Sequence, residues 1–206
     1  EVEFFLVHKN TDPDYELMPP KGRSGRREVA RMSFSIDAVA EFEDFVEDMY
    51  DFADAQALDV DTLIHENGAA QLEINFNHGD PLDMADQVFV FKRTVRETAQ
   101  RHDMYATFMA KPMQKEPGSA LHIHQSILSL ETEKNIFNGP DDEPTAELMH
   151  YIAGLQRYTP DLISFYAPNV NSYRRLAPDI SAPINLSWGY DNRTTAFRVP
   201  DSTPEN

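Results

Sequence analysis

Glu1-Val2-Glu3-Phe4-Phe5 and Leu121-His122-Ile123-His124-Gln125-Ser126 are the two segments on which the interpretation of this chain depends. In each segment ionisable or polar side chains recur at every second position, which is the period of a β-strand, so they project from one face. Carboxylate oxygens and imidazoles on one side of a sheet suit divalent metal ions and the phosphates that such ions hold. We therefore expect strands that carry a metal-binding face.

Composition narrows the classes of function. The 206 residues, 41% of them hydrophobic, suffice for a globular unit with a sizeable core. The formal net charge of −17 argues against binding of nucleic acid or of an anionic membrane, because both partners require a basic surface. No segment resembles a transmembrane span or a signal peptide. We therefore expect no nucleic-acid or membrane partner and a cytoplasmic location.

Missing residue types and motifs exclude several chemistries. The chain has no cysteine, which rules out disulfides, thiolate metal sites and cysteine nucleophiles. It contains neither a Gly-x-x-x-x-Gly-Lys loop nor a Gly-x-Gly-x-x-Gly turn. If a nucleotide binds, metal ions, arginines and a strand must hold its phosphates.

Hydrophobic periodicity predicts alternating strands and helices. The expected strands are residues 1–8, 60–64, 71–76, 104–110, the His-x-His segment, 184–188 and 195–199. The expected helices are residues 36–52 behind a Ser35 cap, 83–101, 146–158 and a short helix within 160–168. Several neighbouring strands are close enough to pair antiparallel, so we predict the mixed α+β class without an internal repeat or a linker.

Acidic residues form the first candidate site. Four glutamates fall in or beside strand-like segments: Glu1, Glu3, Glu66 and Glu73. Strand alternation also turns Gln71, Glu73 and Asn75 the same way. Carboxylates that share one face repel one another unless cations neutralise them, and Mg²⁺ or Mn²⁺ is the usual counter-charge. The alternative is four unrelated surface glutamates.

Histidines and arginines form two further candidate sets. His122, His124 and Ser126 could supply a metal imidazole and polar contacts to phosphate, or could be the polar outer face of a half-buried strand. Arginines at 174, 175, 193 and 198 could bind carboxylate or phosphate, or could make surface ion pairs. Arg193 and Arg198 would project from opposite faces of a straight strand, so a bend is required if both serve one site.

Taken together and in this order, these segments resemble the catalytic domain of the glutamine synthetase family. The matching segments are Glu1–Phe5, Glu66–Glu73, Lys111-Pro112, Gly118–Ser126, Asn171–Leu176 and Asn192-Arg193. The ordered series runs nearly from end to end of the chain. The resemblance implies an incomplete half-barrel of mainly antiparallel strands flanked by helices, in which residues 1–206 are a partial catalytic domain. The start at Glu1 without a Met suggests a piece of a longer protein, and the family's N-terminal domain and C-terminal part are expected to be missing.

The resemblance also implies the roles of individual residues. Glu3, Glu66 and Glu73 match the ligands of a first metal ion, and Glu1 and His122 match ligands of a second ion that bridges the ATP phosphates. The other implied roles are nucleotide contact by His124 and Ser126, glutamate binding by Arg175 and the backbone of Gly118, and phosphate contact by the catalytic arginines Arg193 and Arg198. Two or three Mg²⁺ or Mn²⁺ ions are expected with ATP, and a homo-oligomeric ring is expected for the full-length protein.

In this family ATP phosphorylates the γ-carboxylate of glutamate, and an amine then displaces phosphate. Two departures concern the amine: Ser181 replaces a flap glutamate that binds ammonium in the ammonia-using enzymes, and Pro117 replaces an Asn. The pattern looks most like the γ-glutamylpolyamine (γ-glutamylputrescine) synthetase branch, so the expected substrates are glutamate and a small amine or polyamine such as putrescine. The alternatives are an ammonia-using glutamine synthetase and a non-catalytic member or inactive fragment.

Overall fold

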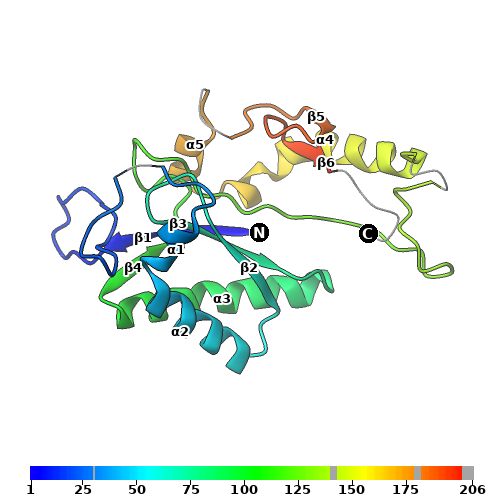
Figure 1. The fold of residues 1–206 in the computed structure, drawn as a ribbon. Helices are drawn as coiled ribbons and strands as arrows, with labels where there is room; N and C mark the ends of the chain where they lie inside the picture. The colour runs from blue at the N-terminus through cyan, green and yellow to red at the C-terminus, as the bar shows by residue number, and fades with distance from the viewer. Residues whose placement is uncertain (30, 140–142, 179–181, 201–206) are drawn as a thin grey trace. The chain divides into compact units, whose positions relative to one another are not determined.

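The computed structural model describes residues 1–29, 31–139, 143–178 and 182–200 (Figure 1). The chain divides into two compact units, Glu1–His122 and Ile123–Asn206, and each is described by itself. Within the described ranges no helix combines the length and the apolar character that crossing a membrane would require.

A four-stranded antiparallel sheet organises the first unit. Its strands are β1 (Val2–His8), β2 (Val60–His65), β3 (Gln71–Phe76) and β4 (Met104–Thr107). The order across the sheet is β2-β3-β1-β4, so the strand nearest the start of the chain lies in the interior of the sheet. The predicted α+β class with antiparallel pairing is confirmed.

Helices cover one face of this sheet. They are α1 (Ile36–Ala40), α2 (Glu43–Ala55) and α3 (Pro81–Arg101), and Figure 1 shows α2 and α3 running side by side beneath the strands. The buried cluster between these layers draws on both: Phe4, Leu6, Leu72, Ile74, Met104 and Ala106 from the strands, and Phe45, Met49, Phe91, Val95 and Ala99 from the helices. Because side chains alternate between the two faces, Glu3, Phe5 and Val7 of β1 turn to the opposite face. Phe5 and Val7 are buried there in a second cluster with Met113.

The helix predicted over residues 36–52 is two helices. Its start was predicted correctly, because the Ser35 side chain accepts a hydrogen bond from the backbone N–H of Ala38. The helix is interrupted at Glu41 and Phe42, where the carbonyl of Glu41 accepts a bond from the backbone N–H of Arg23. The preceding loop therefore uses a carbonyl that a continuous helix would need for itself.

Strand register fixes which side chains share the polar face. Glu3 lies directly opposite Glu73, and Phe5 lies opposite Gln71, in the β1–β3 pair. Directly after β2, the backbone N–H of Glu66 donates to the carbonyl of Gln71. Since the side-chain period is two, Glu1, Glu3, Gln71 and Glu73 turn to the face away from the helices.

Residues 118–122 return to the beginning of β1. The backbone N–H of Glu3 donates to Ala120 over 3.1 Å, and that of His122 donates to Glu1 over 3.1 Å. Val2 and Leu121 form an isolated antiparallel bridge. The prediction of a continuous His-x-His strand was wrong, because among the described residues no strand pairs with residues 123–127. β4 is likewise shorter than predicted and ends at Thr107.

The second unit contains α4 (Ala146–Tyr166), α5 (Val170–Arg175) and a parallel pair, β5 (Trp188–Tyr190) with β6 (Phe197–Val199). Its buried cluster is Phe137, Leu148 and Ile152, against which Trp188 and Val199 pack among others. The predicted break between residues 158 and 160 was wrong, since α4 continues through Pro160. Proline removes a single backbone donor, and the turns on either side remain helical.

The first strand of this pair, predicted over residues 184–188, begins only at Trp188 and runs on to Tyr190, and the second is two residues shorter than predicted. Asn185 accepts a hydrogen bond from the backbone N–H of Ser187, so a turn occupies the start of the predicted strand. The Thr195 hydroxyl is within hydrogen-bond distance of the carbonyls of Asn192 and Phe197, and the second strand begins only at Phe197.

Candidate functional site

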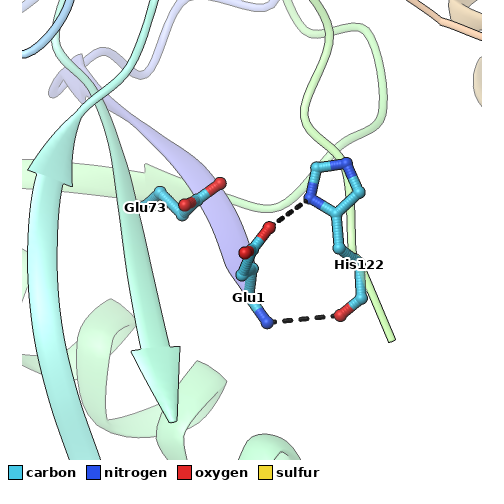
Figure 2. Close-up of side chains that lie close together, drawn as sticks. All are labelled: Glu1, Glu73 and His122. Atoms are coloured by element: carbon cyan, nitrogen blue, oxygen red, sulfur yellow. Dashed lines mark hydrogen bonds and ion pairs between the residues drawn. The ribbon is translucent and has the colours of Figure 1, made fainter. Parts of the chain in front are cut away.

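Glu1, Glu73 and His122 form a three-residue cluster in the first unit (Figure 2). One potential ligand atom from each lies within 4.8 Å of the other two. Glu1 immediately precedes β1, Glu73 is in the middle of β3, and His122 is on the segment that returns to β1. The β1–β3 pairing and the isolated bridge between Val2 and Leu121, rather than a local motif, therefore assemble the cluster.

The geometry of His122 suits a divalent cation. Its Nδ1 atom lies 2.8 Å from Glu1 Oε2 and 4.0 Å from Glu3 Oε1. Nδ1 is buried, yet its contact with Glu1 does not have the geometry of a hydrogen bond. Adjacent ligands of an octahedral Mg²⁺ at about 2.0–2.1 Å lie about 2.9 Å apart. A carboxylate oxygen and an imidazole nitrogen at this spacing, with more carboxylates nearby, fit such an ion.

Glu3 is held rigidly beside this cluster. Its Oε2 accepts hydrogen bonds from the Gln71 side chain and from the backbone N–H of Ala120, both over 2.9 Å. Gln71 is itself fixed, because its amide also donates to the carbonyl of Gly118 and accepts from the N–H of Gly68. The carboxylate of Glu3 therefore has a fixed orientation before any ligand binds.

Glu73 has an unusual protonation equilibrium. Its side chain is buried, and burial together with the charges of Glu1, Glu3 and Glu66 raises its pKa to about 7. Burial is the largest cause, because it disfavours the charged form, and the three carboxylates add repulsion. A bound cation would relieve this repulsion, so the donor set fits a metal ion chemically as well as geometrically.

Glu66 lies at the edge of this group. It follows β2, is half-buried, and its Oε2 accepts a bond from the backbone N–H of Asn67 over 3.1 Å. It is close enough to raise the pKa of Glu73, although the tight three-residue cluster does not include it. The family resemblance implies Glu3, Glu66 and Glu73 as ligands of one metal ion and Glu1 with His122 as ligands of another. This division of the ligands stays a prediction.

The remaining predicted site residues, except Gly118, belong to the second unit. His124 and Ser126 are exposed, Arg175 ends α5 and is half-buried, Arg193 lies in the turn before β6, and Arg198 lies within β6. The bend expected between Arg193 and Arg198 is present, because the side chain of Asn192 accepts the N–H of Thr194 and forms a turn. Ser181, the predicted flap substitution, lies outside the described residues.

Sequence reasoning missed two kinds of supporting residue. Gln71 was seen on the polar face, but its hydrogen bond to Glu3 depends on the β1–β3 register. Glu28 and His65 pair across 37 positions, and no spacing rule could have revealed this contact.

Comparison with known proteins identifies the family. The protein-family model described as "Glutamine synthetase, catalytic domain" matches residues 1–206 of this chain. Gamma-glutamylputrescine synthetase PuuA of Escherichia coli (strain K12) is 36% identical over 203 residues, covering 97% of this chain and 43% of that protein. Glutamine synthetase of Pyrococcus woesei is 36% identical over 201 residues, again covering 97% and 43%.

Solved structures agree on the fold. Apo GmaS without ligand superposes with a TM-score of 0.80 at 27% identity, covering 96% of this chain and 44% of that one. The cryo-EM structure of Plasmodium falciparum glutamine synthetase superposes with a TM-score of 0.84 at 22% identity, covering 100% of this chain and 44% of that one. This similarity bears on the fold alone. The chain spans less than half the length of these relatives. From the full-length match of the family model, with the fold in agreement, it follows that this chain belongs to the glutamine synthetase catalytic-domain family.

Proposed function

We propose that the full-length protein is an ATP-dependent ligase that joins the γ-carboxylate of glutamate to an amine through a γ-glutamyl phosphate. The observation that carries this proposal is the convergence of Glu1, Glu73 and His122 beside the fixed carboxylate of Glu3, in a chain of this family. A concentrated set of carboxylates with one imidazole suits Mg²⁺ or Mn²⁺ together with a polyphosphate.

The proposed metal ligands are Glu3, Glu66 and Glu73 for one ion, with Glu1 and His122 for a second. When bound, two or three divalent ions would neutralise the ATP phosphates and polarise the acceptor carboxylate. The chain's own contribution is pre-orientation, since Gln71 and Ala120 hold Glu3 in place. The buried Glu73 would become ionised on metal binding, because a nearby cation favours the carboxylate form.

The second unit would supply the organic contacts. Arg193 and Arg198 are proposed to bind the transferring phosphoryl group and stabilise its charge, while His124 and Ser126 contact the nucleotide. Arg175 is proposed to grip a carboxylate of glutamate, for which a planar guanidinium is well shaped. The backbone of Gly118 would complete the glutamate site. The match of one family model to residues 1–206 supports treating both units as one partial catalytic domain.

The proposed amine is a polyamine such as putrescine. Its support is the substitution Ser181, which removes a carboxylate ligand for ammonium, and the similarity to a γ-glutamylputrescine synthetase. The net charge of −17 would also attract a polycation to the protein. Ammonia is the second candidate, because an archaeal glutamine synthetase is as similar in sequence, at 36% identity.

Two further properties belong to the proposal. Similarity to glutamine synthetases supports a homo-oligomeric ring for the full-length protein, located in the cytoplasm. The chain alone is proposed to be inactive, because it spans 43% of the length of its relatives. A non-catalytic protein is the remaining alternative, and the retained glutamates and His122 argue against it.

Phosphate release from ATP tests the function. We expect the full-length protein to release phosphate with glutamate and putrescine in the presence of Mn²⁺ or Mg²⁺, and far less with ammonium at the same concentration. Equal or faster turnover with ammonium would replace the polyamine assignment by glutamine synthetase activity. If no amine tested led to phosphate release, the non-catalytic alternative would be favoured.

A further inference from the structure

A buried histidine–carboxylate contact lies beside the loop that carries Glu66. His65 Nε2 is 3.0 Å from Glu28 Oε2, the His65 side chain is fully buried, and that of Glu28 is 12% exposed. Taking such a pair out of water is costly, so it persists only where additional contacts offset the desolvation. The additional contacts here are all with the loop.

The pair holds both ends of the loop formed by residues 66–70. Glu28 Oε2 also accepts the backbone N–H of Ala70 over 2.8 Å. On the other side of the imidazole, Nδ1 lies 2.8 Å from the carbonyl of Glu66, which can only accept, so Nδ1 carries a proton. One carboxylate and one imidazole therefore connect the first residue of the loop to the last.

The loop needs this restraint because its backbone is strained. Ala70 has a φ of 54°, in the left-handed region that is unfavourable for a residue with a side chain. The residues that flank the strained turn are Glu66, a proposed metal ligand, and Gln71, whose amide binds Glu3. A relaxed loop would move both.

We propose that Glu28 and His65 are positioning residues, which hold the 66–70 loop so that Glu66 and, through Gln71, Glu3 face the metal ions. This inference rests on the proposed function, since it requires divalent ions bound by these glutamates. Neither Glu28 nor His65 is among the proposed metal ligands, so their effect on metal binding would be indirect.

Mn²⁺ affinity, measured by electron paramagnetic resonance or calorimetry on the full-length protein without nucleotide, tests the proposal. Glu28→Ala should weaken Mn²⁺ binding by about 10–100-fold, as loss of an outer-shell partner does at metal sites. Glu28→Gln keeps an oxygen that can accept the N–H of Ala70, so it should restore part of the affinity. Asp48→Ala is the matched control, because it breaks another histidine–carboxylate pair, His102 with Asp48 at 2.8 Å, between α2 and the end of α3.

The outcomes separate this proposal from the function on which it rests. Wild-type Mn²⁺ affinity in a folded Glu28→Ala protein overturns the positioning role and leaves the metal site standing. An equal loss in Asp48→Ala also overturns it, because the effect would then be general destabilisation. Absence of Mn²⁺ binding by the unaltered protein removes the metal site, and the positioning role with it. If circular dichroism shows that Glu28→Ala does not fold, Glu28→Gln decides, and unchanged affinity there counts against the proposal.

Discussion

At the residue scale, the ionised form of Glu73 is destabilised by burial and by the other carboxylates of the candidate site. It is buried, it faces three other carboxylates, and its pKa is raised to about 7. A carboxyl with a folded-state pKa above its unfolded value binds its proton more tightly in the folded protein. Its contribution to stability is therefore fully present below the unfolded pKa of 4.5 and is lost as pH rises through about 7.

The metal-free protein should accordingly lose stability as pH rises from about 5 to about 8, by an amount that depends on Glu73. We expect Glu73→Gln to make thermal unfolding, followed in EDTA across this range, less dependent on pH. Saturating Mn²⁺ should flatten the wild-type curve, since a cation favours the ionised carboxyl. Glu97→Gln, an exposed position on α3, should keep the wild-type dependence. If thermal stability depended on pH identically in the wild type and in Glu73→Gln, the raised pKa of Glu73 would be contradicted.

The alternation of Glu1, Val2 and Glu3 was enough to predict a polar strand face at the residue level. It could not predict that Glu73 lies opposite Glu3, because register is a property of two strands. Nor could it reveal Gln71 as the anchor of Glu3 or Glu28 as the partner of His65. These contacts join residues 68 and 37 positions apart, and a single sequence contains no local sign of them.

Elements were predictable where the hydrophobic period was clear. β3 alternates clearly and was predicted with its observed bounds. The helix predicted over residues 83–101 is α3, which begins two residues earlier, at Pro81 behind an Asp80 cap that the prediction did not use. The predictions failed where tertiary contacts overrode local preference. A backbone N–H of the preceding loop, that of Arg23, binds the carbonyl of Glu41 and divides residues 36–52. The helix through Pro160 continues although proline alone suggests an end.

Asp80 gives a test of the cap that starts α3. Its side chain accepts the backbone N–H groups of Leu82 and Asp83 over 3.0 and 3.3 Å. Asp80→Ala should lower the free energy of unfolding in urea by about 1 kcal/mol, because these donors lose their partner and the helix N-terminus loses a favourable charge. Asp86→Ala, exposed on the same helix, should change it by less than about 0.5 kcal/mol. Equal effects of the two variants would show that the cap contributes little.

At the scale of the molecule, the proposed metal ligands Glu1, Glu73 and His122 and the proposed phosphate-binding arginines belong to different units. Glu1, Glu73 and His122 lie within Glu1–His122, whereas Arg193 and Arg198 lie within Ile123–Asn206. Composition gave no sign of this division, since no low-complexity linker separates the units. Metal binding and phosphate binding should therefore be separable by mutation.

Arg193→Ala tests this separation in the full-length protein. Mn²⁺ affinity without nucleotide should stay within about twofold of wild type, while phosphate release should fall by about 100-fold, as expected for loss of a group that stabilises transition-state charge. Arg157→Ala, an exposed arginine of α4, should leave both quantities near wild type. A large loss of Mn²⁺ affinity in Arg193→Ala would mean that metal binding also depends on the second unit.

The interior position of β1 has a consequence for folding during synthesis on the ribosome. Within this chain β1 leaves the ribosome first, yet its strand partners β3 and β4 begin at residues 71 and 104. At a synthesis rate of roughly 5–20 residues per second, β1, which contains Phe4, Phe5 and Leu6, stays unpaired for several seconds. Its exposed apolar side chains can then bind a chaperone or aggregate. Pairings this distant in sequence also slow folding. His122 is the last member of the metal cluster to emerge, so capture of the metal would mark a first unit that has been fully synthesised and folded.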